Sequence, residues 1–217
     1  MQIAWKGHAC FHIIAQRVKQ EQVKIVIDPF DPSIGLRLPS MEADVVLVTH
    51  NHSDHNNTKG VKGEPFVISS PGEYEIKDIF VQGIPSFHDN SQGKERGMNT
   101  IYTIEVEGIR VCHLGDFGQA ELSAEQVEKI GNIDVLCIPV GGVYTIGAKA
   151  AAKIVGQIEP RTVIPMHYLL PNLKFKLEKV DEFLRTMGAG KAEPQNKLTL
   201  KAKDLTGEET KVVVLIP

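Results

Sequence analysis

The 217-residue sequence contains only three cysteines, and they are far apart: Cys10, Cys112 and Cys137. Each lies in an apolar stretch with the composition of a β-strand. An odd number of separated cysteines in such stretches favours reduced, buried thiols over a disulfide framework or a zinc ribbon.

Long apolar runs and basic runs are also missing. No stretch approaches the roughly 18 apolar residues of a membrane-spanning helix. The first 16 residues lack the apolar centre and cleavage pattern of a secretory signal, so we expect a cytoplasmic protein with no membrane partner. No run of Lys and Arg reaches five, and the formal net charge is -3. Charge therefore does not favour nucleic-acid binding, although small anions stay open as ligands.

The composition is that of an ordinary globular protein, with 42% hydrophobic and 24% charged residues. We find no long linker, low-complexity segment or sequence repeat, and we expect one domain over residues 1–217. A homo-oligomer is compatible with this sequence.

Strand patterns dominate the first half of the chain, and strands alternate with helices in the second half. Strands are predicted at 3–5, 10–14, 23–27, 45–48, 66–69, 79–84, 99–106, 109–114, 134–139 and 161–165. Helices are predicted over 123–130, 147–158 and 177–187, the first with Ser123 and Gln126 in capping-box spacing. The tail, 197–216, is predicted to form a β-hairpin. This order favours two packed sheets with helices outside.

Several predicted strands end in a residue capable of chemistry. These residues are Asp28, His50, His88, Asp116 and His167. Rigid strands position the side chains of the loops that follow them, so these distant segments are candidates for one shared site.

The stretch VLVTHNHSDHNN, residues 45–56, places three histidines and an aspartate within six positions. In an extended segment, side chains two residues apart point the same way, so His50 and His52 can bind one ion. Asp54 and His55, beyond the turn, can reach a second ion. Imidazole and carboxylate groups are ligands of transition metals, so the pattern predicts a metal site at a strand end. A histidine-rich surface loop, or a helix N-cap at Asp54, is the alternative.

The motif TH-x-H-x-DH resembles that of the metallo-β-lactamase-fold hydrolases. The other family motifs follow in the same order: IDP with Asp28, PSFH with His88, LGD with Asp116 and PMHY with His167. The phrases KGHACFHI, VIDPF, CHLGDFG and VIPMHY resemble the compact branch that includes L-ascorbate-6-phosphate lactonase-like proteins. The resemblance covers the whole chain and implies an α+β fold, a four-layer αββα sandwich.

The same resemblance implies a binuclear metal centre. Its first ion would be held by His50, His52 and His88, its second by Asp54, His55 and His167, and Asp116 would bridge the two. Asp28 would support the loop that carries the histidines, with a turn residue before Pro29 as the alternative. Zinc is the expected ion, and manganese, iron and nickel are compatible with the same ligands.

Charge accounting indicates which substrate such a centre would bind. Two divalent ions offset by Asp54, Asp116 and a hydroxide leave roughly one positive charge, which favours a small anionic substrate. Our hypothesis is that one ion polarises a carbonyl or phosphoryl oxygen, a bridging hydroxide attacks, and Asp54 or a bound water manages the proton. The predicted function is hydrolysis of an ester, lactone or phosphoester bond. The alternative is a non-catalytic metal-binding or regulatory protein.

Some further residues have open roles. His8 is compatible with a place in the metal cavity and with a structural role, whereas His12 and His113 are interpreted as core or surface histidines. The remaining cases are Asn99, expected to orient a loop; Gln119, where many compact relatives carry a histidine; and Tyr144 and Tyr168, for which packing is preferred over a place in the pocket wall.

Overall fold

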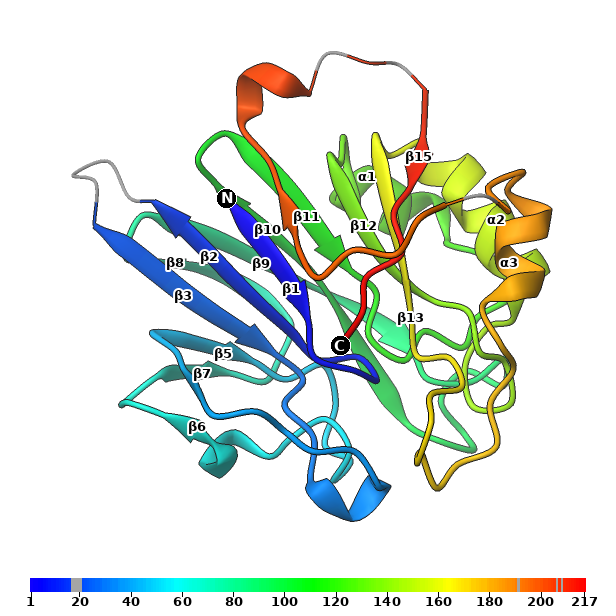
Figure 1. Ribbon diagram of the computed structural model, residues 1–217, viewed down its shortest axis with the longest axis horizontal. Helices are drawn as coiled ribbons and strands as arrows, with labels where there is room; N and C mark the ends of the chain where they lie inside the picture. The colour runs from blue at the N-terminus through cyan, green and yellow to red at the C-terminus, as the bar shows by residue number, and fades with distance from the viewer. Residues whose placement is uncertain (17–20, 191, 206, 208) are drawn as a thin grey trace.

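Two β-sheets lie face to face across a shared apolar core in the computed structural model (Figure 1). The structure describes residues 1–16, 21–190, 192–205, 207 and 209–217. Within these ranges, no helix is long and apolar enough to cross a membrane.

The first sheet is built mainly from the beginning of the chain and has the strand order β14-β1-β2-β3-β5-β7. Its strands are β1 (Gln2–Trp5), β2 (Phe11–Gln16), β3 (Gln22–Ile27), β5 (Val45–Leu47), β7 (Phe66–Ile68) and β14 (Leu198–Thr199). β3, β5 and β7 are parallel to one another. Their carboxyl ends therefore lie at the same edge of the sheet.

The second sheet has the order β15-β13-β12-β11-β10-β9-β8. Its strands are β8 (Gly72–Ile76), β9 (Ile79–Phe87), β10 (Met98–Val106), β11 (Ile109–His113), β12 (Val135–Pro139), β13 (Thr162–Met166) and β15 (Lys211–Val212). Strands β8 to β11 are antiparallel, and β11, β12, β13 and β15 are parallel. The carboxyl ends of β9, β11 and β13 consequently share one edge.

Central strands of the first sheet are apolar on both faces. In β3, Ile25 and Ile27 belong to the core between the sheets, whereas Val26 belongs to a second apolar cluster on the outer face. Segments 29–43 and 58–62 cover that outer face; they contain β4 (Met41–Glu42), β6 (Val61–Lys62) and the 3₁₀ turns η1 (Pro32–Ile34) and η2 (Thr58–Gly60). The outer layer on this side is thus made of short turns and a two-stranded ribbon.

Three α-helices lie on the side of the second sheet, next to β12 and β13 in Figure 1. They are α1 (Ala124–Ile130), α2 (Ala148–Ile158) and α3 (Asp181–Thr186). The predicted capping box is confirmed, because Ser123 Oγ accepts from the Gln126 backbone and Gln126 Oε1 accepts from the Ser123 backbone. The expected α+β sandwich is confirmed, and the three cysteines are buried and free as predicted.

The predicted C-terminal hairpin is wrong. β14 pairs with β1 in the first sheet, whereas β15 pairs with β13 in the second, and the 3₁₀ turn η3 (Ala202–Asp204) lies between them. Residues 206 and 208 of the predicted segment lie outside the described residues. Each two-residue strand extends the edge of a sheet formed by earlier segments, and an exposed edge is a ready partner for a passing strand.

The predicted helix over 177–187 is also too long, since α3 begins only at Asp181. The backbone of Glu178 is engaged elsewhere: its N–H donates to Gly141 O at 2.8 Å, and its carbonyl accepts from Leu169 N at 2.9 Å. These tertiary hydrogen bonds keep the segment before Asp181 out of the helix, although its apolar spacing is helical.

Candidate metal centre

The seven side chains predicted as metal ligands converge where the carboxyl ends of the two sheets meet. Histidine nitrogens and carboxylate oxygens within 4.8 Å of one another form three overlapping groups. The groups are His50, His52 and His88; His50, His55 and Asp116; and His8, His55 and His167.

Asp116 belongs to one of these groups and lies close to histidines of the other two. Its Oδ2 atom is 3.2 Å from His167 Nε2, 3.3 Å from His55 Nε2 and 3.4 Å from His88 Nε2. Burial alone would raise the pKa of Asp116, but the neighbouring His167 and His55 hold it well below its usual range. The carboxylate is therefore ionised at neutral pH and can contact cations on more than one side.

Asp54 extends the cluster on the side of His8. Asp54 Oδ2 is 3.7 Å from His55 Nε2 and 3.1 Å from His8 Nε2. Burial opposes ionisation of Asp54, but the hydrogen bond from His8 and the charge of His55 lower its pKa. Burial and the proximity of His167 lower the pKa of His8 to about 4. His8, whose role the sequence left open, is thus a fully buried member of the cluster.

Asp28 determines which ring nitrogens two of the histidines present to the cluster. Its Oδ2 accepts the Thr49 hydroxyl at 2.7 Å and lies 3.0 Å from His55 Nδ1. Because the Thr49 hydroxyl donates to Asp28, its oxygen accepts from His50 Nδ1 at 3.0 Å. Both rings are therefore protonated at Nδ1 and present Nε2 to the cluster. The predicted supporting role of Asp28 is confirmed.

Three residues of the site have left-handed backbones, with φ of 54° at His8, 47° at Asp28 and 52° at His167. Such angles are uncommon outside glycine, and strained residues concentrate at functional sites. The carbonyl of His8 accepts from His167 N and from the Trp5 indole, both at 2.9 Å. These bonds join the end of β13 to the turn after β1.

The structure assigns supporting roles to other residues that the sequence singled out. Asn99 Oδ1 accepts from Asp116 N at 3.0 Å, as expected of a loop-orienting residue. Gln119 Oε1 accepts from Phe87 N at 3.0 Å and so fixes the backbone next to His88. Tyr168 packs on Trp5, and buried His113 contacts Ala9 O, as predicted for core residues. His12 is half-buried in β2.

Unpaired atoms in the cluster test whether these residues fit a metal. Within the described residues, the buried His50 Nε2 and Asp116 Oδ1 atoms have no hydrogen-bond partner. Burying an unpaired polar atom is costly, so native proteins normally provide a partner or an ion. Burial and nearby His55 lower the pKa of His50 to about 3, which keeps its ring neutral and able to ligate. The donor set fits divalent transition-metal ions.

A cavity of about 250 Å³ opens onto the cluster. Its floor contains five of the predicted ligands, and its wall contains Arg96, Tyr144 and Phe175. The preferred interpretation of Tyr144 as a packing residue was wrong, since the residue lines this cavity and is 40% exposed. Arg96 and Phe175 were missed because neither lies in a recognised motif or in a predicted strand or helix.

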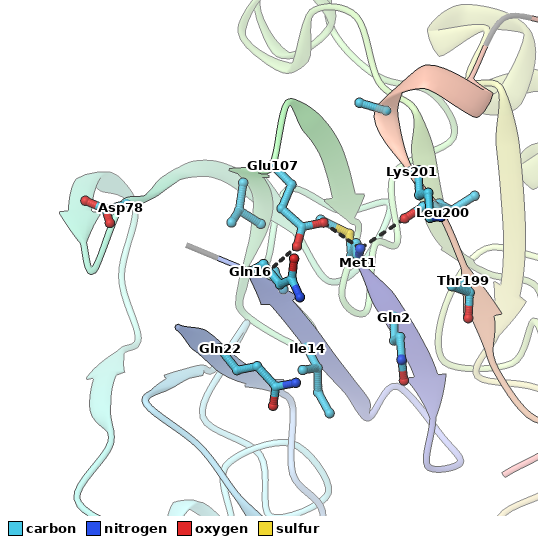
Figure 2. Close-up of a pocket in the computed structure, with 13 residues that line it drawn as sticks. Met1, Gln2, Ile14, Gln16, Gln22, Asp78, Glu107, Thr199, Leu200 and Lys201 are labelled. Carbon is cyan, nitrogen blue, oxygen red and sulfur yellow. Dashed lines mark hydrogen bonds and ion pairs between the residues drawn. The ribbon is translucent and has the colours of Figure 1, made fainter. Parts of the chain in front are cut away.

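A second cavity, of about 570 Å³, lies at the opposite end of β10 from Asn99 (Figure 2). Figure 2 shows the Glu107 carboxylate between the Met1 amino group and the backbone of Gln16. The Met1 amino group also donates to Leu200 O at 3.0 Å. These contacts join β1, β2 and the segment after β14, which indicates a structural role for this end of the sheets.

Comparison with known proteins places the chain in a family. A family model described as a beta-lactamase superfamily domain matches residues 2–167. A UPF0173 metal-dependent hydrolase of Thermococcus onnurineus is 32% identical over 198 residues, covering 77% of this chain and 84% of that protein. A second UPF0173 metal-dependent hydrolase, from Pyrococcus abyssi, is 30% identical, and the alignment covers 100% of this chain and 97% of that protein.

A crystal structure from Thermotoga maritima, assigned as a Zn-dependent hydrolase of the metallo-beta-lactamase superfamily, shares 40% identity with a TM-score of 0.78. The alignment covers 99% of this chain and 97% of that one. Together with the histidine and aspartate cluster, these similarities show that the chain is a metal-dependent hydrolase of the metallo-β-lactamase superfamily and belongs to its UPF0173 members.

Proposed function

We propose that this hydrolase cleaves an ester, lactone or phosphoester bond of a small anionic substrate at a binuclear metal site. The observation that carries the proposal is the set of seven histidine and aspartate side chains made of Asp116 and six others gathered around it, with buried ligand atoms that lack protein partners within the described residues. A non-catalytic protein would have little reason to keep so complete a ligand set.

The proposed ligands follow from the groups of neighbouring atoms. The first ion would be held by His50, His52 and His88, and the second by Asp54, His55 and His167. Asp116 would bind both ions, because its Oδ2 lies within 3.4 Å of a nitrogen from each group. Zinc is the expected ion from the imidazole and carboxylate donors, and manganese, iron and nickel suit the same donors.

Bound at this site, two divalent ions would supply a hydroxide at neutral pH and polarise the oxygen of the scissile bond. Asp54 is the proposed catalytic residue. The hydrogen bond from His8 and the charge of His55 keep its carboxylate ionised, so it is free to accept a proton. It would take the proton released when water becomes hydroxide and pass it to the leaving group, with the ions supplying the acidity that so weak a base needs. His8, 3.1 Å away, would fix the orientation of that carboxylate. The substrate on which Asp54 acts would be held in the adjoining cavity.

Turnover of a generic phosphodiester and a generic lactone by zinc- or manganese-loaded protein tests the proposal. Replacing Asp54 removes the proton acceptor, so Asp54→Ala should lower kcat/KM by about 100-fold or more for whichever substrate is cleaved. His52→Ala should lower kcat/KM to a similar extent, because it removes a proposed metal ligand. His12→Ala, a change on β2 outside the cluster, should leave turnover unchanged. Wild-type activity in Asp54→Ala would contradict the role given to that residue.

A further inference from the structure

Arg96 brings a positive charge to the wall of the 250 Å³ cavity, whose floor holds the carboxylates of Asp54 and Asp116. The chain as a whole carries a formal charge of -3 and does not itself attract anions. A cationic group at this wall is therefore a local feature of the site. Its position depends on a loop, residues 89–97, that connects His88 to the start of β10.

Asp89 holds this loop in one conformation. Its Oδ1 accepts from Ser91 N at 2.7 Å and Gly93 N at 2.9 Å, and its Oδ2 accepts from Glu95 N at 3.0 Å and Arg96 N at 2.8 Å. Asp89 is only 4% exposed and directly follows His88. Four backbone N–H groups thus donate charge-assisted hydrogen bonds to one buried carboxylate, and these bonds fix the backbone of Arg96 relative to His88, a proposed metal ligand.

The side chain of Arg96 is packed but keeps its charge available. Its guanidinium carbon lies 5.6 Å from the centroid of the Tyr144 ring, and that ring lies 6.2 Å from Phe175. Stacking on an aromatic face orients a guanidinium without neutralising it. Its ion pair with Glu95 spans 3.6 Å, and the Glu95 side chain is 62% exposed, so solvent screens that pair.

Tyr144 is held in place by an unusual backbone. The preceding residue, Val143, has φ of 58°, which is rare for a β-branched residue, and Tyr144 N donates to Gly142 O at 2.6 Å. Strain of this kind persists where the surrounding structure requires it, commonly at ligand sites. The aromatic wall and the guanidinium are thus both preorganised beside the cavity.

We infer that Arg96 is the substrate anchor: it binds a carboxylate or phosphate group remote from the scissile bond, while the apolar part of the substrate packs on Tyr144 and Phe175. A guanidinium offers paired donors that match either anion. The cavity is smaller than the 300–1,000 Å³ of drug-sized ligand sites, so the substrate class is a small organic anion. The inference rests on the proposed function, since the reacting end of the substrate must lie at the metal ligands.

Calorimetric titration of zinc-loaded protein with glycerol 3-phosphate and with glycerate tests this inference. Arg96→Met should weaken binding of the preferred anion about tenfold or more, with metal content unchanged. The affinity of Arg96→Lys should lie between those of wild type and Arg96→Met, because lysine keeps the positive charge but lacks the paired N–H donors of a guanidinium. Arg185→Met, a matched change on the exposed face of α3, should bind as wild type does. The anion whose affinity falls more in Arg96→Met identifies the anchored group as phosphate or carboxylate, because anion binding by the zinc ions is common to wild type and variant.

Equal affinities in wild type and Arg96→Met, or binding of neither anion by wild type, would overturn the anchor. In either case a normal metal content would leave the proposed hydrolytic centre standing. A wild-type chain that takes up no metal would overturn the centre and the anchor together.

Discussion

Asp28 shows how one buried carboxylate can orient the side chains of a proposed metal site through hydrogen bonds. It fixes the ring of His55 directly and the ring of His50 through the Thr49 hydroxyl. Burial works to raise the pKa of Asp28, but the charge and hydrogen bond of His55 lower it, so Asp28 is ionised at neutral pH. The charge also favours a hydrogen-bond-donating Nδ1 in each ring.

Asp28→Asn should therefore weaken metal binding by about 10- to 100-fold. Asp28 accepts from Thr49 N through Oδ1 and from the Thr49 hydroxyl and His55 Nδ1 through Oδ2, whereas an amide has only one accepting oxygen and would turn its NH2 group toward a donor. Competition with a chromophoric chelator measures the affinity. Asp31→Asn is a matched control, since Asp31 caps the turn η1 and lies outside the cluster. Equal affinities in Asp28→Asn and Asp31→Asn would show that Asp28 does not orient the ligands.

The sequence predicted the place of some residues at the site but not of others. The ligand candidates followed from residue type, because histidines and aspartates at strand ends carry a recognisable chemistry. Arg96 and Phe175 did not, since their place at the cavity depends on loop paths set by hydrogen bonds, from Arg96 N to Asp89 and from Lys174 N to Ile34 O. His8 was ambiguous for a related reason: its left-handed turn, not its neighbours in sequence, aims it at Asp54.

Strand ends and loops are packed so closely that a methyl group is not tolerated at some positions. A Cβ added at Gly118 would lie 2.4 Å from the carbonyl carbon and oxygen of His88 and 2.5 Å from Asp89 N. Gly118→Ala should therefore displace the loop after β9 and lower the free energy of unfolding by about 1–3 kcal/mol, with weaker metal binding.

Gly156→Ala is the matched control for that substitution. Gly156 lies in α2, and a Cβ there would have no described heavy atom within 4 Å apart from its chain neighbours and the nearby backbone of its own helix. Alanine should raise stability by about 0.5–1 kcal/mol through helix propensity and leave metal binding unchanged. Urea unfolding of both variants checks the pair. Gly118→Ala with wild-type stability and metal affinity would contradict the close packing at His88.

The stability that the loop at residues 89–97 gives to the fold should depend on pH through the ionisation of Asp89. Burial alone would raise the pKa of Asp89, but backbone N–H groups of Arg96, Ser91, Glu95 and Gly93 lower it to about 2. A carboxyl group with a depressed pKa stabilises the fold above its unfolded pKa of about 3.9, and this contribution is lost as pH falls through the folded value.

Wild type should therefore exceed Asp89→Asn in stability at pH 6, and the difference should shrink as the pH is lowered from about 4 toward 2. Urea unfolding at several pH values, with chelator present in every sample, measures the difference without a contribution from metal loss. A difference that stays constant over this range would show that the Asp89 charge does not hold the loop.

At the scale of the whole molecule, strand direction explains why distant residues form one site. β3, β5, β9, β11 and β13 all point their carboxyl ends to the edge where Asp28, His50, His88, Asp116 and His167 follow them. The sequence predicted this convergence because apolar strands are visible as local patterns. It did not predict the partners of β14 and β15, since two-residue edge strands carry little pattern and pair with distant segments.

The measurement that tests the binuclear site most directly is elemental analysis of protein purified without chelator. We expect about two divalent ions per chain, as two-metal hydrolytic sites require. His50→Ala and Asp116→Ala should each hold less metal, and His12→Ala should hold as much as wild type. Absence of metal from wild type, even after incubation with zinc and manganese, would contradict the account.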